Sequence, residues 1–266
     1  MKRYDELIEH IKKYPGKKIC LAFSGGVDSV LVLKACLDAQ KEVLPVMFQT
    51  VLHPARELDE ARKLAEQLGT KLHVVILDEF QHPEIMENTP QRCYFCKKAL
   101  FSSLCSYAKT HLCDVVLDGT NLDDLSEYRP GLQALKELGI HSPLAEIGFT
   151  KPEVRASLAD MGLSVASKPS SPCMATRLPY GTTITREAVE MIEKAESFLK
   201  ELGFTQVRVR KHDEIARVEF VPSELKQAIL NREKICAAFH KYGFDYITLD
   251  LECFRSGSMD IHIKKE

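Results

Sequence analysis

Apolar residues in the first half of the chain occur in short runs that alternate with longer segments of helical periodicity. The runs that predict strands span residues 19–23, 42–48, 72–77 and 115–117. Between the first two runs, apolar residues from Val27 to Leu37 recur at the spacing of one helix face. This alternation predicts an α/β fold, in which a parallel sheet carries helices on both faces.

A different pattern begins near residue 181. The first pattern ends with a helix that is expected to finish near Gly162. Its start is indicated by Thr150-Lys151-Pro152-Glu153, which has the spacing of a helix capping box. The Ser- and Pro-rich stretch 166–181 predicts a long connection. Beyond it we predict helices at 186–202 and 223–242, with strands at 207–211, 215–220 and 246–251. We therefore expect an α/β domain of residues 1–181 and a smaller C-terminal α+β domain of residues 182–266.

Composition narrows the class of protein. The 266 residues are 45% hydrophobic and 28% charged, with a net charge of -2, which is typical of a globular protein and not of one that coats nucleic acid. The first residues lack the apolar run of a signal peptide, and no stretch approaches the roughly 20 apolar residues of a membrane span. We expect a cytoplasmic protein. Its nine cysteines, an odd number, argue against a disulfide framework, so some are expected to bind a ligand.

The first candidate site lies between the first strand and the following helix. Gly25 and Gly26 put backbone without side chains at a helix start, where N–H groups can converge on a phosphate. Ser24 and Ser29 add hydroxyl groups, and Asp28 is suited to hold a bridging Mg²⁺ ion. The alternative is an ordinary Gly-Gly turn. Neither a Walker motif nor a G-x-G-x-x-G is present.

The hexapeptide Ser24–Ser29 resembles the SGGxDS motif of PP-loop ATP pyrophosphatases. That resemblance implies cleavage of ATP between its α and β phosphates and adenylation of a substrate oxygen. A later segment, 117–124, resembles the element that completes the nucleotide site of this class. It offers close backbone approach at Gly119, polar groups at Thr120 and Asn121, and a carboxylate at Asp123 or Asp124. The alternative is a plain Asp/Gly/Asn turn.

Three cysteines stand apart from the rest. Cys93 and Cys96 form a C-x-x-C, and Cys173 lies in the Ser/Pro connection, where Arg177 would favour its thiolate. The other six lie in or beside apolar patterns, where cysteine acts as a small hydrophobe. Three thiolates suit either zinc with a fourth ligand or a [4Fe-4S] cluster with one iron left open. The cluster needs no missing ligand.

The motifs together resemble the LarE family of sulfur-inserting enzymes along nearly the whole chain. The matching segments are Ser24–Ser29, residues 88–97, 118–121, 127–131, Cys173 with 177–182, and 254–257. The resemblance implies that ATP adenylates a carboxylate of pyridinium-3,5-biscarboxylate mononucleotide and that sulfur then displaces AMP to give a thiocarboxylate. It also implies a homo-oligomer assembled through the C-terminal domain.

The same resemblance assigns roles to individual residues. It carries catalytic roles to Cys173, Asp28, Glu127 and Arg177, although a turn salt bridge is the alternative for Glu127 and Arg177. In single-cysteine members the cysteine corresponding to Cys173 gives up its own sulfur. Because Cys93 and Cys96 are present here, the chain resembles the three-cysteine type, in which sulfide or another sulfur donor on a [4Fe-4S] cluster would make turnover catalytic.

A mononucleotide substrate carries its own phosphate. Arg208 and Arg210 have strand period 2 and so share one face, with Arg217 and Arg255 in neighbouring segments. Guanidinium groups suit phosphate, and the family resemblance assigns substrate-phosphate binding to the pair. The alternative is an exposed strand face carrying solvated charge.

Three other functions compete with this interpretation. A tRNA thiolase also combines a PP-loop with cysteines, but it predicts an extended basic surface that a net charge of -2 does not suggest. Amide-forming PP-loop enzymes, such as NAD or GMP synthetases, would not need the three cysteines. A zinc-stabilised nucleotide-binding module without turnover is the non-enzymatic alternative.

Overall fold

The structure, a computed structural model, describes residues 2–54, 56–126, 130–169, 172–255 and 258–259. Its contacts divide the chain into two compact units. The first comprises Met1–Glu79 and Cys93–Ser171, and the second comprises Phe80–Arg92 and Pro172–Glu266. By this division residues 80–92 and 172–181 belong with the C-terminal residues. The predicted assignment of nucleotide chemistry to 1–181 and substrate binding to 182–266 stays a prediction.

The first unit is built on a parallel sheet of four strands. These are β1 Lys18–Ala22, β2 Glu42–Gln49, β3 His73–Ile76 and β4 Val115–Leu117, in the spatial order β3-β2-β1-β4. Ile19 of β1 lies between Val43 of β2 and Val115 of β4. All four predicted strands form, each to within two residues, and the α/β class is confirmed.

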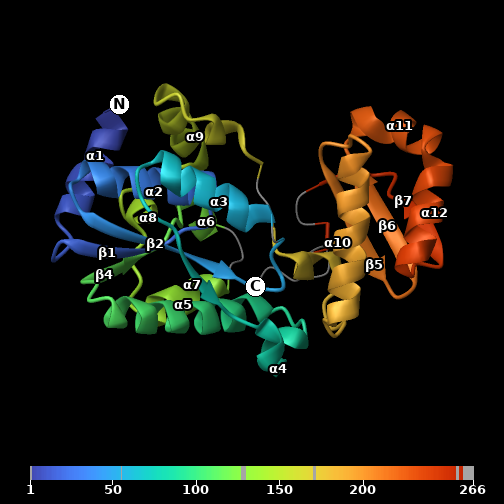
Figure 1. Ribbon diagram of the computed structural model, residues 1–266, viewed down its shortest axis with the longest axis horizontal. Helices are drawn as coiled ribbons and strands as arrows, with labels where there is room; N and C mark the ends of the chain where they lie inside the picture. Colours follow the sequence, from blue (N-terminus) through green and yellow to red (C-terminus); the bar gives the residue numbers. More distant parts are fainter. Residues whose placement is uncertain (1, 55, 127–129, 170–171, 256–257, 260–266) are drawn as a thin grey trace. The chain divides into compact units, whose positions relative to one another are not determined.

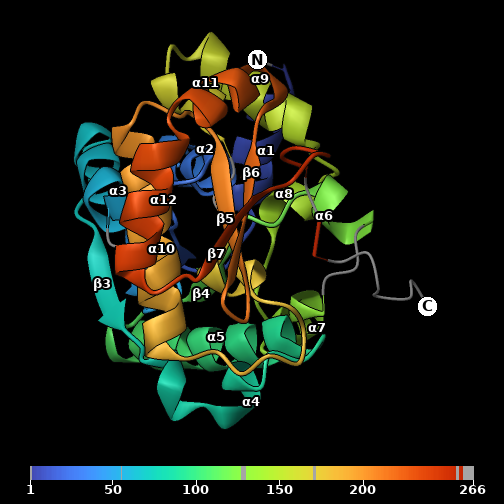
Figure 2. The ribbon, with the colours of Figure 1, turned by 90° about the vertical axis from the view of Figure 1, so that its right-hand side faces the viewer.

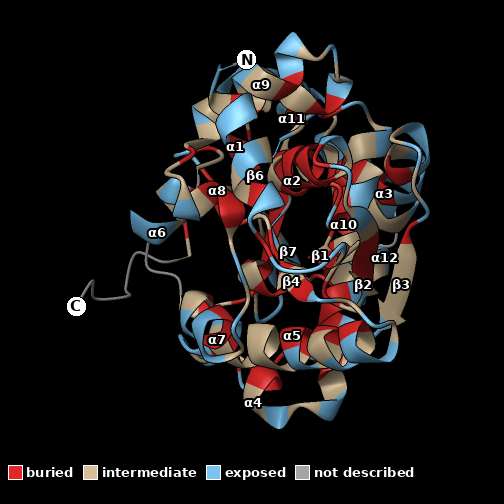
Figure 3. Ribbon diagram, turned by 90° about the vertical axis from the view of Figure 1, so that its left-hand side faces the viewer, coloured by how far each residue is buried: buried red, intermediate tan, exposed pale blue. Residues whose placement is uncertain are grey.

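Helices cover both faces of this sheet (Figure 1). They are α1 Lys2–Lys12, α2 Val27–Asp38, α3 Arg56–Gln67, α5 Arg92–Thr110, α6 Leu122–Ser126, α7 Gly131–Glu137, α8 Pro143–Glu146 and α9 Lys151–Asp160. One apolar core joins the sheet to α1, α2 and α9 through residues such as Leu31 and Leu158. The other joins it to α5 and α7 through Leu104 and Leu135. Figure 3 shows how completely α2 is buried between its neighbours.

The predicted capping box at the start of α9 is confirmed. The Thr150 amide donates to Oε2 of Glu153 at 2.8 Å, and the Glu153 amide donates back to Oγ1 of Thr150 at 3.5 Å. The helix ends at Asp160, and Gly162 follows with a φ of 71°, a left-handed conformation that glycine adopts without strain. The box fixes the direction in which Lys151, the first residue of the helix, leaves the backbone.

The second unit has a mixed sheet of β5 Val207–His212, β6 Ile215–Phe220 and β7 Tyr246–Leu249. Strands β5 and β6 are antiparallel, whereas β6 and β7 are parallel. Helices α10 Arg186–Glu201 and α12 Arg232–Tyr242 contact each other beside this sheet (Figure 2). Two short elements, η1 Glu79–Gln81 and α4 Pro83–Met86, precede the segment that leads into α5. The predicted small α+β unit is therefore present.

The single helix predicted over 223–242 is wrong in its continuity. A 3-10 turn, η4 Pro222–Glu224, leads into α11 Leu225–Leu230, and Asn231 then separates α11 from α12. The Asn231 side-chain amide donates to the Gln227 carbonyl at 2.9 Å. Asparagine competes in this way with the backbone pattern of a helix, which explains the break.

No helix formed by the residues that the structure describes is long and apolar enough to cross a membrane.

Candidate active site

The predicted phosphate cradle forms the turn between β1 and α2. Gly25 has a φ of 67°, and Gly26 caps α2 without any side-chain hydrogen bond to the first helical amides. A Cβ atom on Gly25 would lie 3.0 Å from the Cβ of Ala61, so both conformation and space require glycine. Ser29 donates its hydroxyl to the Gly26 carbonyl at 3.0 Å. The cradle therefore offers backbone amides at a helix start, as phosphate binding requires.

Gly119 brings the second nucleotide-binding element against this turn. A Cβ atom on Gly119 would lie 2.9 Å from the backbone nitrogen of Ser29. The close approach predicted at Gly119 is thus one between the two protein segments. Thr120 donates its hydroxyl to Oδ2 of Asp118 at 2.5 Å, which fixes the turn beyond β4.

Asp28 is the carboxylate at the centre of these two elements. Nδ2 of Asn121 donates to Oδ1 of Asp28 at 3.2 Å, and Nζ of Lys151 forms an ion pair with its other oxygen. Lys151 was not among the predicted site residues, although its place directly after the N-cap of a capping box is a signal for a cation held in a fixed position. Asp123 accepts the Lys151 amide at 2.7 Å, whereas Asp124 faces the pocket described next.

A pocket of about 320 Å³ lies beside the cradle in the first unit. Six predicted nucleotide-binding residues line it, namely Ser24, Asp28, Ser29, Gly119, Thr120 and Asp124. Gly25, Gly26 and Asn121 contribute through the cradle backbone and the contact with Asp28 described above. The apolar part of the lining includes Met47, Phe48 and Phe101, which suits a flat base. His53, Glu57 and Lys97 also line the pocket and had no recognisable sequence signal.

The C-x-x-C lies in the first turn of α5, where residues three apart share a face. Cys93 is exposed and Cys96 is half-buried. A Cβ on Gly131 would lie 3.2 Å from the Cys93 carbonyl and 2.7 Å from Cδ of Lys97, so glycine allows α7 to pack here. Cys173, half-buried, precedes the 3-10 turn η3 Met174–Arg177 of the second unit.

The structure does not by itself assemble a metal site. Among the described residues, no three Cys, His, Asp or Glu side chains are grouped as a metal ion would need. Cys93 and Cys96 belong to the first unit and Cys173 to the second, so the three-cysteine ligand set stays a prediction. Cys36 is fully buried, and burial raises the pKa of its thiol to about 12, which fits a structural cysteine.

Arg177 is a buried residue that organises the Cys173 turn. Its Nε and one terminal nitrogen donate to the two oxygens of Glu196 at 2.9 and 3.0 Å. Its other terminal nitrogen donates to the carbonyls of Pro172 at 2.7 Å and Cys173 at 3.0 Å. Burial opposes ionisation of Glu196, but the neighbouring Arg177 outweighs it, so the pKa of that carboxyl lies below its usual range. Arg177 thus makes the salt bridge that was the alternative to a catalytic role.

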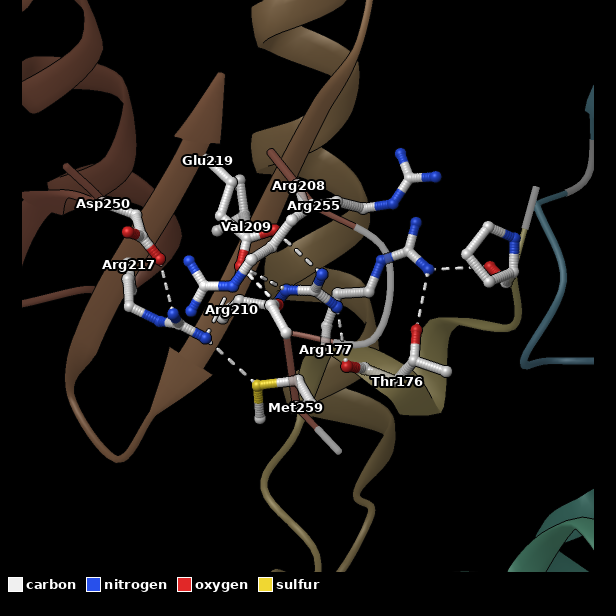
Figure 4. Close-up of polar contacts among 12 residues, drawn as sticks. Thr176, Arg177, Arg208, Val209, Arg210, Arg217, Glu219, Asp250, Arg255 and Met259 are labelled. Atoms are coloured by element: carbon white, nitrogen blue, oxygen red, sulfur yellow. Dashed lines mark hydrogen bonds and ion pairs between the residues drawn. The ribbon is translucent and has the colours of Figure 1, made fainter. Parts of the chain in front are cut away.

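The two strand arginines differ from the alternative interpretation, an exposed strand face carrying solvated charge, and their substrate-phosphate role stays a prediction. Neither is solvated, because Arg208 and Arg210 expose only 7% and 5% of their surface. Arg210 makes a two-point ion pair with Glu219, at 3.0 and 2.8 Å, and donates to the Thr176 carbonyl at 2.9 Å (Figure 4). The alternative of solvated charge is therefore wrong, and Arg210 already has a counter-ion.

Arg208 makes no such direct ion pair, although Glu196 and Glu219 act on its charge from nearby. Its guanidinium donates to the Val207 carbonyl at 2.7 Å and lies over the Phe254 ring at 5.2 Å, but no carboxylate among the described residues pairs with it. Burial, followed by repulsion from Arg177, lowers the pKa of Arg208 to about 10. A buried cation that remains charged at neutral pH, and whose charge nearby carboxylates offset only in part, is suited to bind an anion.

The remaining residues named in the sequence prediction are Arg217, Arg255 and Glu127. Arg217 pairs with Asp250 at 2.6 Å, and Arg255 pairs with Glu252 at 2.5 Å. Glu127 lies outside the described residues, so its catalytic role remains a prediction.

The fold and the cradle together define a class of protein. A four-stranded parallel sheet, with Ser-Gly-Gly-Val-Asp-Ser between its first strand and helix, is the architecture of PP-loop enzymes that use ATP. Residues 1–106 match the NAD synthase family, which is consistent with this class.

Relatives that align along nearly the whole chain identify the family. The chain is 38% identical over 251 residues to pyridinium-3,5-bisthiocarboxylic acid mononucleotide synthase of Lactiplantibacillus plantarum, covering 94% of this chain and 91% of that one. It is also 38% identical to an uncharacterized protein of Synechocystis sp., over 95% and 96% of the two chains. A tRNA-specific 2-thiouridylase MnmA of Heliobacterium modesticaldum is 26% identical, over 58% of this chain and 50% of its own. The chain belongs to the LarE family, that of the mononucleotide synthase.

Proposed function

We propose that this chain is an ATP-dependent sulfurtransferase that converts a carboxylate of pyridinium-3,5-biscarboxylate mononucleotide into a thiocarboxylate. Its likeness to the named synthase along nearly the whole of both chains carries the proposal. The cradle at Ser24–Ser29 and the pocket beside it supply the expected place for ATP.

Activation of the carboxylate is the first step. A carboxylate oxygen attacks the α-phosphorus of ATP, the bond from that phosphorus to the bridging oxygen breaks, and pyrophosphate leaves with the electron pair. The cradle amides and Lys151 would stabilise the charge of the phosphates. Asp28 would hold Mg²⁺, which would supply further positive charge there. A sulfur nucleophile then attacks the acyl carbon and AMP departs, because AMP is a far better leaving group than an oxide ion.

Arg208 is the main residue that would bind the substrate's own phosphate. Its burial and lack of a carboxylate partner support this role, since an arriving phosphate would compensate its charge. Arg210 keeps N–H groups that make no bond to described residues, but Glu219 already neutralises its charge. We therefore propose that Arg208 contributes more to phosphate affinity than Arg210, with Arg255 as a further contact.

Cys93, Cys96 and Cys173 would hold a [4Fe-4S] cluster. The shared face of Cys93 and Cys96 on α5 fits two ligands of one cluster, and thiolates are the donors that such clusters use. When bound, the cluster would supply an iron without a protein ligand, at which inorganic sulfide can be held. In this proposal Cys173 ligates the cluster and keeps its own sulfur.

The rival functions have less support. The MnmA of Heliobacterium modesticaldum aligns over only 58% of this chain and 50% of its own length, at 26% identity. The NAD synthase match ends at residue 106 and does not include Cys173. Homo-oligomer formation through residues 182–266 and a cytoplasmic location remain part of the proposal, and light scattering and cell fractionation test them.

The decisive experiment combines protein purified without oxygen with ATP, sulfide and the biscarboxylate mononucleotide, and follows AMP and thiocarboxylate by mass spectrometry. We expect more than one product per protein. If product stops at one sulfur per chain and Cys173 becomes dehydroalanine, the protein is a sacrificial donor and the catalytic version is wrong.

Metal analysis tests the cluster directly. We expect about four irons per chain, from the stoichiometry of a [4Fe-4S] cluster, and their loss in Cys96→Ala. Cys105, half-buried on the same helix, provides the matched control, and Cys105→Ala is expected to keep its iron. Stoichiometric zinc without iron would instead support the zinc-stabilised module.

A further inference from the structure

Lys168 is a cation held at the phosphate cradle, although it lies far from the cradle in the chain. Its Nζ donates to the Gly25 carbonyl at 3.3 Å and forms an ion pair with Oε2 of Glu60 at 3.0 Å. All three residues belong to the first compact unit. Nothing in the sequence pattern around Lys168, which lies in the Ser/Pro connection, indicated a place beside the cradle.

Helix α9 fixes the backbone at Lys168. Arg155 of this helix donates to the Lys168 carbonyl at 2.8 Å. The Lys168 amide donates to the Val165 carbonyl at 2.9 Å, which closes the 3-10 turn η2 Ser164–Ser167. The first residue of α9 is Lys151, the partner of the cradle carboxylate. One helix therefore places two cations at the cradle hexapeptide.

The contacts that Lys168 makes in this structure are of the kind that a phosphate would replace. An ammonium group has three N–H donors, and the described residues account for two of those of Lys168. The Glu60 side chain is 55% exposed, so water weakens its ion pair with Lys168. A phosphate oxygen is charged and accepts stronger hydrogen bonds than a neutral carbonyl does. Lys168 can thus turn to an anion on the cradle without losing a strong ion pair.

The position of Lys168 selects the outer phosphates of a nucleotide. Ser24 and Ser29 line the pocket that suits the base, whereas Gly25 and Lys168 are not part of its lining. A triphosphate that leaves this pocket over the cradle has its β and γ phosphates farthest from the base. A cation attached at Gly25, outside the pocket, is therefore placed for these two phosphates.

We propose that Lys168 is a binding residue for the β and γ phosphates of ATP and for the pyrophosphate that they become. This inference rests on the proposed function, because it takes ATP as the ligand of the cradle. The positive charge of Lys168 stabilises the negative charge that grows on the leaving pyrophosphate while the bond to the α-phosphorus breaks. Lys168 acts at Gly25, separately from Lys151, which pairs with Asp28.

The first measurement is calorimetric binding of ATP, inorganic pyrophosphate and AMP, each with Mg²⁺. Lys168→Ala is expected to bind ATP and pyrophosphate roughly tenfold more weakly, the effect of one lost hydrogen bond to a charged group. Its affinity for AMP is expected to be unchanged, which also shows that the variant folds. Lys168→Arg keeps the charge and is expected to recover most of the affinity.

Glu60→Gln provides a test of opposite sign. It removes the carboxylate that competes for Lys168, so pyrophosphate affinity is expected to rise by roughly two- to fivefold, the scale of a surface ion pair. If Lys168 and Glu60 formed only a surface ion pair, neither substitution would change pyrophosphate affinity. Lys63→Ala, which removes an exposed lysine of the same helix α3, is the charge-matched control for Lys168→Ala and is expected to match the unaltered protein.

The outcomes separate this inference from the proposed function. If the unaltered chain binds ATP and pyrophosphate and Lys168→Ala binds them equally well, the role of Lys168 is overturned while the proposed function stands. Equal weakening of ATP and AMP in Lys168→Ala also overturns the role, because a general distortion of the cradle then explains the loss. If the unaltered chain binds neither ATP nor pyrophosphate, the assignment of the cradle to ATP is itself wrong, and the role of Lys168 fails with it.

Discussion

Two neighbouring arginines of β5 are expected to respond in opposite ways to the same substitution. Arg208→Met removes a buried guanidinium that has no direct ion pair and that Glu196 and Glu219 stabilise only in part, whereas Arg210→Met removes the closer cation paired with the buried Glu219 and leaves Arg217 at 3.5 Å. Both variants replace the charge with an apolar side chain of comparable length at sites of similar burial. The pair therefore separates the effect of charge compensation from the effect of packing.

The structure sets the size of each effect. The lowering of the Arg208 pKa from its ordinary value to about 10 corresponds to an unfavourable free energy of about 3 kcal/mol at most. Loss of its bond to the Val207 carbonyl offsets about 1 kcal/mol of this. Arg208→Met is expected to raise the free energy of unfolding by about 1–2 kcal/mol. Arg210→Met is expected to lower it by about 3–5 kcal/mol, as breaking a buried ion pair generally does.

The assay is thermal unfolding at neutral pH, followed by circular dichroism, with substrate affinity measured by calorimetry. At about 2–4 °C per kcal/mol, both changes in melting temperature are measurable. Arg208→Met is also expected to weaken binding of the biscarboxylate mononucleotide by at least about tenfold, the loss expected on removing a charge-assisted contact, while ATP binding is unchanged. An enzyme would thus gain stability by losing a functional residue.

The sign of the pH dependence follows from the same pKa. Because the folded-state pKa of Arg208 lies below its value in the unfolded chain, the cost of its charge is fully present below about pH 10. The cost disappears as pH rises from there towards the unfolded-state pKa, so the advantage of Arg208→Met is greatest at neutral pH. If Arg208→Met lowers the melting temperature as much as Arg210→Met does, the charge is already compensated and the inferred phosphate role loses its physical basis.

Further predictions concern the nucleotide site and the structural thiols. Gly119→Ala would place a Cβ 2.9 Å from the Ser29 nitrogen and is expected to weaken ATP binding by at least about tenfold in equilibrium titration, because the cradle must shift; binding equal to the unaltered protein would refute the close approach. Lys151→Gln leaves Asp28 without its cation and is expected to slow pyrophosphate release by roughly 100-fold, the scale of one lost electrostatic donor, with little change in melting temperature; an unchanged rate would mean that Lys151 does not act on the phosphates. Cys36 is expected to resist iodoacetamide at pH values near neutrality, where the burial-raised pKa keeps its thiol protonated; its alkylation in folded protein, found by peptide mapping, would contradict that burial.

Much of the framework was predictable because local patterns determine it. The apolar runs that form β1–β4 are bounded by turn residues, and the capping box at Thr150 gives the start of α9. The cradle was also predictable, since its glycines, serines and Asp28 are adjacent in sequence. These features depend on residues that are close in the chain, where periodicity and turn chemistry are informative.

Contacts between distant residues were not predictable in the same way. The two-residue repeat of a strand placed Arg208 and Arg210 on one face. It could not show that, of these two residues, only Arg210 would form an ion pair with Glu219. Lys151 and Asp28 are likewise 123 residues apart, and only the packing of α9 brings them together. The break at Asn231 arises from a local bond that competes with a helix, and helical spacing of the apolar residues conceals it.

The second unit is made of two separate chain segments, and this has a consequence for its folding during synthesis. Phe80–Arg92 is made early, yet the rest of that unit begins only at Pro172, 80 residues beyond Arg92. At about 5–20 residues per second, a ribosome needs roughly 4–16 s to add that length. During this interval Asn88 and Arg92 lack the hydrogen-bond partners that residues 175–181 provide. The early segment therefore stays exposed to solvent and accessible to chaperones until the last third of the chain is made.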